Sequence, residues 1–101
     1  MIVVNAVIEA SEENIDAMRE AIAIMEKKSQ AESGCHDYTF SIEMNDPTKI
    51  RITEKWESMA DLEAHFREPH MADFQQAMGA HPPKSVVANF FEVTEIPGPG
   101  Q

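Results

Sequence analysis

Two histidines and a tryptophan lie close together in the chain, and they are the side chains best suited to chemistry. Trp56 ends one predicted element, and His65 and His70 follow shortly after it. An imidazole titrates near neutral pH, so it can accept and return a proton during a reaction. An indole offers a flat face on which an aromatic ligand can stack. The stretch from Trp56 to Met78 is therefore the predicted centre of a site for acid–base chemistry on a small ligand.

A purely structural interpretation of these histidines stays open. His65 shares a helical face with Leu62 and Phe66, where an imidazole can pack and bind the backbone. His70 follows Pro69 at a predicted helix start and can serve as a cap or a packing residue. The histidines lack the paired spacing of metal ligands, and no glycine-rich phosphate loop and no flavin or nicotinamide motif is present in the sequence. We therefore predict no metal and no cofactor.

Hydrophobic periodicity predicts the elements that must position this site. Alternating or continuous apolar runs predict strands at 1–9, 35–43, 49–56 and 85–95. Helical spacing predicts one long helix between Ser11 and Gly34 and two shorter helices that meet at Pro69. This order is that of the split βαβ, or ferredoxin-like, α+β fold with an antiparallel sheet. We expect one domain over residues 1–95 and a flexible tail over 96–101.

The first and last predicted strands carry apolar residues on both faces, for example Val3 and Val4, or Phe90 and Phe91. Helices on one side of a four-stranded sheet cover only one of its faces. The other face therefore needs a partner, and a second copy of the chain is the simplest candidate. Two such sheets packed face to face would form a dimeric α+β barrel.

Composition narrows the classes of function. The chain has 101 residues, a formal net charge of −10, and an apolar share of 43%. An acidic surface repels phosphate backbones and anionic bilayers, so we expect neither a nucleic-acid partner nor a membrane partner. Cys35 is the single cysteine, and no leader or membrane-spanning run is evident in the sequence. These features predict a cytoplasmic protein.

A set of short pieces occurs in order along nearly the whole chain, from Ile2 to about Val93. The pieces are Glu32-Ser33-Gly34-Cys35 leading to Tyr38, then Asp46-Pro47, then Glu54-Lys55-Trp56-Glu57-Ser58, then His65, Pro69-His70 and Phe74. In this order and spacing, the chain resembles the antibiotic biosynthesis monooxygenase (ABM) domain family, including its small quinol monooxygenase-like proteins. The resemblance implies the ferredoxin-like subunit and a homodimeric barrel.

Several chemistries occur on this fold, so the resemblance leaves more than one function open. We predict a cofactor-independent monooxygenase that oxidises a quinol or polyphenolic aromatic with molecular oxygen. One alternative is an isomerase or tautomerase of a small oxygenated metabolite, phosphorylated or not, in quorum-signal breakdown. Another is a ligand-binding dimer without turnover. Haem degradation, which also occurs in the family, ranks behind these.

The resemblance implies roles for the candidate residues. The predicted catalytic residues are His65 as the base, Trp56 as a stacking face and Asn5 as a donor to the developing oxyanion. Tyr38 would hydrogen-bond a substrate oxygen, and Glu54 would hold the imidazole in one tautomer. The predicted substrate-binding residues are Tyr38, Glu54, His70, Phe66 and Phe74.

Overall fold

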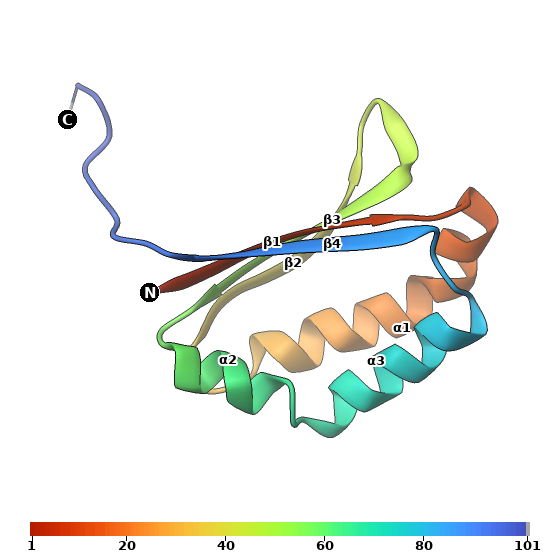
Figure 1. Ribbon diagram of the computed structural model, residues 1–101, viewed down its shortest axis with the longest axis horizontal. Helices are drawn as coiled ribbons and strands as arrows, with labels where there is room; N and C mark the ends of the chain where they lie inside the picture. Colours follow the sequence, from red (N-terminus) through yellow and green to blue (C-terminus); the bar gives the residue numbers. More distant parts are fainter. Residues whose placement is uncertain (101) are drawn as a thin grey trace.

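The computed structural model describes residues 1–100, which form a four-stranded antiparallel sheet with the helices on one face (Figure 1). In chain order the elements are β1 (Ile2–Glu9), α1 (Glu12–Gln30), β2 (Cys35–Glu43), β3 (Asp46–Trp56), α2 (Met59–His65), α3 (Pro69–Ala80) and β4 (Ser85–Glu92). The strand order is β2-β3-β1-β4. The predicted ferredoxin-like α+β fold is confirmed.

The central strand β1 explains why the sheet has two different faces. Its alternate residues Ile2, Val4, Ala6 and Ile8 are buried beneath the helices. Val3, Asn5 and Val7 point to the opposite face, where Asn5 is exposed. Because β1 pairs with both β3 and β4, its register fixes which residues of those strands share each face.

Caps and breaks in the sequence set the ends of the helices. Ser11 accepts a hydrogen bond from the Asn14 backbone N–H at the start of α1, and Ser58 does the same for Asp61 at the start of α2. Pro69 occupies the first turn of α3, where its missing N–H costs nothing, and separates α3 from α2. The break turns the chain so that α2 and α3 lie over different parts of the sheet (Figure 1).

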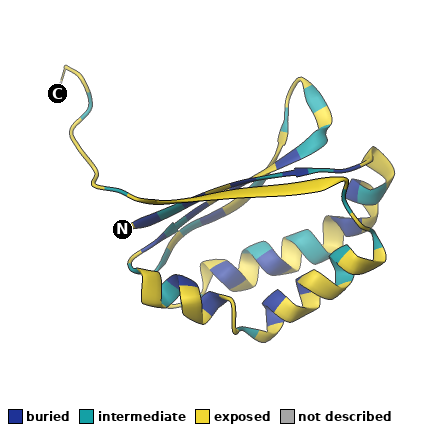
Figure 2. Ribbon diagram, in the orientation of Figure 1, coloured by how far each residue is buried: buried dark blue, intermediate teal, exposed yellow. Residues whose placement is uncertain are grey.

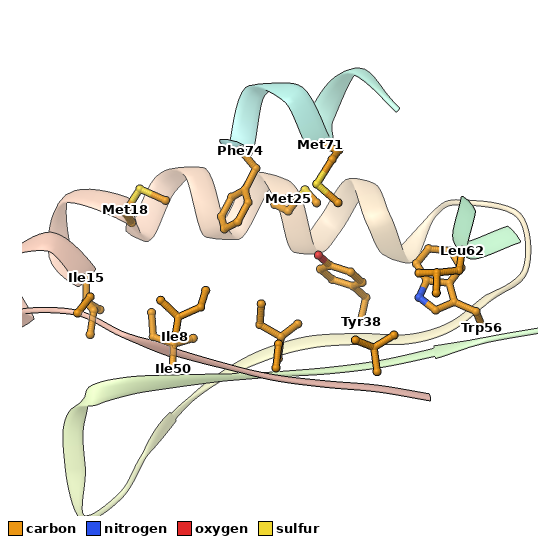
Figure 3. Packing of buried hydrophobic residues seen from close by; sticks show 14 of the residues in the cluster. Ile8, Ile15, Met18, Met25, Tyr38, Ile50, Trp56, Leu62, Met71 and Phe74 are labelled. Atoms are coloured by element: carbon orange, nitrogen blue, oxygen red, sulfur yellow. The ribbon is translucent and has the colours of Figure 1, made fainter. Parts of the chain in front are cut away.

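The hydrophobic core lies between the sheet and the helices (Figures 2 and 3). Ile15, Met18 and Met25 project from α1, and Met71 and Phe74 project from α3. At one end of this layer Trp56 is completely buried beside Leu62. Since a fully buried indole is rigidly held, Trp56 fixes where β3 ends relative to α2.

The start of β2 differs from the predicted alternation. A register shift between Cys35 and Asp37 places Cys35 opposite Trp56, while Tyr38 pairs with Glu54. As a result His36 is exposed and does not share the buried face of Tyr38. The extra residue is a β-bulge, which inverts the alternation locally.

The second face of the sheet, which we call the open face, carries no helix among residues 1–100 (Figure 1). Val87 pairs with Val7, and Phe91 pairs with Val3, so these apolar side chains share the open face. Val87 is 56% exposed and Phe91 is 47% exposed. The apolar open face is as the sequence predicted, while the second copy that would cover it stays a prediction.

Two strand ends differ from the predicted boundaries. β3 begins at Asp46 instead of at residue 49, and β4 ends at Glu92 instead of at residue 95. No helix within residues 1–100 is both long and apolar enough to cross a membrane.

Candidate active site

A cavity of about 160 Å³ lies between the sheet and the α2–α3 segment. Its walls are mostly aliphatic and aromatic, with polar groups from only a few residues. The lining residues are Val4, Ala6, Ile8, Tyr38, Ile52, Glu54, Phe66, Met71, Phe74, Gln75, Met78, Val86, Ala88 and Phe90. A dry apolar cavity of about 150 Å³ is large enough to bind benzene. The cavity therefore suits a ligand built on a single aromatic ring.

Glu54 brings a carboxyl group to this apolar cavity. It is 8% exposed and accepts a hydrogen bond from the Trp56 indole, with Nε1 and Oε1 3.0 Å apart. Burial has the largest effect on the pKa of the Glu54 carboxyl and raises it. The hydrogen bond from Trp56 and a positive charge on His65 lower this pKa, and the negative charge of Glu32 raises it. The net shift is upward, so Glu54 holds a proton more readily than an exposed glutamate.

Tyr38 faces Glu54 across the β2–β3 pair and lines the same cavity. It is 2% exposed, and its hydroxyl is directed away from the sheet toward the helices (Figure 3). Burial, and then the negative charge of Glu54, raise the pKa of the Tyr38 hydroxyl. Tyr38 therefore stays a neutral phenol, and a neutral phenol can donate a hydrogen bond to a ligand oxygen.

His65 lies behind this wall and does not line the cavity. Its side chain is 1% exposed and lies against Trp56 and Tyr38, with ring centroids 4.8 Å and 5.2 Å away. Nδ1 of His65 is 2.7 Å from Oε2 of Glu32. Nε2 is buried and has no hydrogen-bond partner in the described part of the chain.

Glu32 holds a second imidazole with the same oxygen. Nε2 of His70 is 2.6 Å from Oε2 of Glu32. An ionised carboxylate only accepts hydrogen bonds, so each bound nitrogen carries a hydrogen. In neutral His65 the lone pair is then on Nε2, the nitrogen without a partner. Glu32 thereby selects the tautomer of both histidines.

The Glu32, His65 and His70 donor atoms lie within 4.8 Å of one another, which raises the question of a metal ion. Both nitrogens approach the same carboxylate oxygen at hydrogen-bond distances. Ligands of one metal ion instead surround a common centre, each with its own donor atom. The geometry is that of two hydrogen bonds to a shared acceptor, and the absence of a metal stays a prediction.

The structure assigns the tautomer-holding role differently from the sequence prediction. Glu54 was expected to hold the His65 imidazole, but it binds the Trp56 indole, and Glu32 binds His65. The reason is that His65 ends α2 near the end of α1, where Glu32 lies, whereas Glu54 projects into the cavity. Glu32 was noticed only as part of a family motif, since its position after the helix gave no sign of its partners.

Two predicted catalytic residues lie away from the cavity. Asn5 is exposed on the open face, because β1 alternates and its buried residues are even-numbered. Trp56 is completely buried and does not line the cavity, so no ligand face is available on its indole. Within this chain, Asn5 cannot reach an oxyanion in the cavity, and Trp56 acts through its hydrogen bond to Glu54.

The predicted substrate-binding residues divide into two groups. Tyr38, Glu54, Phe66 and Phe74 all line the cavity. His70 instead lies beside Lys28, Ser33 and Glu68 at a separate open hollow on the surface. His70 therefore belongs to the support behind the cavity and not to its wall.

Gly34 explains how Glu32 reaches the two histidines. The φ angle of Gly34 is +79°, a conformation that favours glycine, and any side chain at this position would collide with Asp61 of α2. The loop after α1 therefore packs directly on the start of α2. This close approach brings Glu32 to the junction of α2 and α3.

Comparison with known proteins places this arrangement in a family. The sequence profile described as antibiotic biosynthesis monooxygenase matches residues 1–77. A stretch of 55 residues is 38% identical to YgiN of Escherichia coli, described as a probable quinol monooxygenase. The match covers 46% of this chain and 53% of YgiN, so the chain spans about half the length of the curated relatives it matches.

Solved structures show the same fold. A Deinococcus radiodurans protein, described provisionally as an antibiotic biosynthesis monooxygenase, has a TM-score of 0.89 at 20% identity and 97% coverage of both chains. Rv0793 from Mycobacterium tuberculosis has a TM-score of 0.84 at 18% identity, with 96% of this chain and 98% of that chain covered. Because the family profile spans most of the sequence and the fold agrees with it, this chain belongs to the antibiotic biosynthesis monooxygenase family.

Proposed function

We propose that this protein is a cofactor-independent monooxygenase that oxidises a small quinol with molecular oxygen in the cavity between the sheet and α2–α3. The observation that carries the proposal is the cavity itself. It offers room for one aromatic ring between apolar walls, with the Tyr38 and Glu54 side chains among its lining residues. The family and the similarity to YgiN support the reaction class.

The reaction needs a proton acceptor because oxygen takes electrons from a phenolate far more readily than from a phenol. In the proposed reaction a hydroquinone and dioxygen give a hydroxyquinone and water. One oxygen atom stays on the ring, and the other leaves as water, so the substrate supplies all the electrons. Tyr38 would hydrogen-bond a ring oxygen, and the phenyl groups of Phe66 and Phe74 would hold the ring.

The alternative substrates fit the cavity less well. A phosphorylated metabolite needs cationic or N–H donors, and the lining residues described for this cavity include no lysine or arginine. Its volume of about 160 Å³ is also too small for a macrocycle such as haem. Proton transfer without oxygen, as in a tautomerase, uses the same acid–base groups, and the assay below separates it from oxidation.

Oxygen uptake with a panel of substituted hydroquinones, in metal-free buffer, tests the proposed function. We expect uptake with single-ring quinols, and one labelled oxygen atom in the product when ¹⁸O₂ is used. Ala88→Leu would fill the cavity from β4 and should raise KM about tenfold. Ala17→Leu on the exposed surface of α1 is the matched control. Binding of quinols without uptake would instead support the ligand-binding alternative, and proton exchange without uptake the tautomerase.

We also propose that two copies of the chain pack their open faces together, as the sequence predicts. The exposed Val87 and Phe91 side chains support this, because apolar surface on a strand face normally finds a partner.

A cytoplasmic location is proposed on the basis of the acidic composition and the single, half-buried cysteine.

A further inference from the structure

Access to the cavity and a free proton-accepting atom are found on two different residues, Glu54 and His65. Glu54 reaches the cavity and is the one carboxylate among its described lining residues. His65 does not line the cavity, but its Nε2 carries an unused lone pair in a buried position. An unpaired buried nitrogen costs stability, and such atoms in folded proteins often mark a functional role.

Trp56 brings these two groups together. Its indole N–H is 3.0 Å from Glu54, and its ring centroid is 4.8 Å from that of His65. A positive charge on His65 also lowers the pKa of Glu54, so the two groups are electrostatically linked. Glu54 therefore lines the cavity, and His65 lies behind it, with its ring against the Trp56 indole that binds Glu54.

We propose that Glu54 is the catalytic base that takes the proton from a ring hydroxyl, and that His65 then receives this proton at Nε2. This inference rests on the proposed function, since it names the acid–base groups of that site. The upward pKa shift of Glu54 agrees with it, because a carboxylate of raised pKa is a stronger base.

The two proton transfers balance. In the first, the ring hydroxyl loses a proton to the Glu54 carboxylate and becomes a phenolate. In the second, the Glu54 carboxylic acid gives its proton to Nε2 of His65 through one bridging water, because Nε2 has no direct hydrogen-bond partner, and His65 becomes an imidazolium. The stored proton returns by the same route to the reduced oxygen, so no net proton leaves the site.

Glu32 is the positioning residue that allows His65 to hold this proton. An imidazolium that is 1% exposed would be strongly disfavoured without a counter-charge. Oε2 of Glu32 is 2.7 Å from Nδ1 and supplies that charge. His70 shares the same oxygen and keeps the Glu32 carboxylate in place from the side of the surface hollow.

Binding of 4-nitrophenol tests the inference without requiring turnover. This phenol fits a single-ring cavity, resists oxidation, and changes colour when it loses its proton. At a pH where free nitrophenol is mostly neutral, the native protein should produce the nitrophenolate band. In parallel, ¹⁵N NMR of the imidazole should show His65 becoming protonated at both nitrogens.

Glu54→Gln is the decisive variant, because glutamine keeps the volume and still accepts the Trp56 hydrogen bond. It should bind nitrophenol as the neutral phenol and leave His65 neutral. Where the native protein turns over a quinol, the variant should be about 100-fold slower in kcat. Glu57→Gln, at an exposed position just past β3, is the matched control and should behave like the native chain.

Each result has a separate meaning. Equal nitrophenolate formation in native protein and Glu54→Gln would overturn Glu54 as the base. Nitrophenolate formation with His65 still neutral would overturn the transfer to Nε2. Absence of nitrophenolate in the native protein would overturn the inference as a whole. Nitrophenol ionisation that depends on Glu54, together with no oxygen uptake on any quinol, would leave the inference standing and reject the oxygenase.

Discussion

Oε2 of Glu32 lies 2.7 Å from Nδ1 of His65 and joins the end of α1 to the end of α2. Both side chains are nearly inaccessible to solvent, and the same oxygen also holds His70. One carboxylate thus fixes the orientation of two imidazoles at the junction of three helices. The loss of this group should affect stability and histidine chemistry together.

Glu32→Gln should destabilise the protein by about 2–3 kcal/mol, because a glutamine cannot accept both hydrogen bonds through one charged oxygen. Its amide accepts with one atom and donates with the other, so one imidazole must change tautomer or lose its partner. Urea unfolding measures the stability, and ¹⁵N NMR of the histidines measures the tautomers. Glu57→Gln, whose carboxylate pairs with the exposed His36, should leave the stability and the tautomers of His65 and His70 unchanged and should affect only the His36 signals. Unchanged ¹⁵N shifts in Glu32→Gln would contradict the assigned tautomers.

The raised pKa of Glu54 predicts the direction in which the free energy of unfolding changes with pH. Its pKa in the folded protein is raised above the ordinary value of 4.5, chiefly by burial. The folded state therefore favours the protonated form, and this contribution is full below about pH 4.5 and is lost as the pH rises through the folded pKa. Glu54→Gln stays neutral throughout. The variant should gain stability relative to the native protein as the pH rises from 4 to 8.

Urea unfolding of the native protein and Glu54→Gln across this pH range measures the difference. A difference that does not change with pH would mean that Glu54 has an ordinary pKa in the folded chain. Glu57→Gln again supplies the control for removing one negative charge from an acidic protein.

The fold could be predicted from sequence because its signals are local. The continuous apolar run of β1, the alternation in β3, the Ser11 cap and the Pro69 break each depend on neighbouring residues. The bulge at His36 was missed, since alternation alone does not show where an extra residue enters a strand. Asn5 was assigned to the site through the family resemblance, and its strand pattern could not correct this, because a strand that is apolar on both faces does not show which face the helices cover.

The site was only partly predictable because its contacts join distant parts of the chain. Tyr38, Glu54, Phe66 and Phe74, which the family resemblance predicted to bind substrate, all line the cavity, and their role in binding stays a prediction. Glu32 was not chosen, because it meets His65 and His70 only after α1, α2 and α3 have packed. Trp56 was expected to face a ligand, but its position at the end of β3 buries it completely.

The proposed dimer is best tested by two substitutions on the same strand. Val87 lies on the open face, whereas its neighbour Val86 lines the cavity on the helix face. Val87→Lys should convert the dimer to a monomer at micromolar concentration, because a lysine opposite another copy cannot be buried unpaired. Val86→Lys should leave the dimer intact and weaken ligand binding. Sedimentation velocity measures both, and a native chain that sediments as a monomer would reject the dimer.

Cys35 offers a chemical probe of the charge on Glu32 and Glu54. Burial, and then the negative charges of these two carboxylates, raise the pKa of the Cys35 thiol to about 11. Only the thiolate reacts with iodoacetamide, so at pH 8 the reaction should be about 100-fold slower than that of a free cysteine. Of the two carboxylates, Glu32 raises the thiol pKa more. Glu32→Gln should therefore lower that pKa and accelerate the alkylation of Cys35, which mass spectrometry can follow. Glu57→Gln should alkylate at the native rate. If Cys35 of the native protein reacted as fast as free cysteine, neither its burial nor the charge of Glu32 would raise the pKa of its thiol.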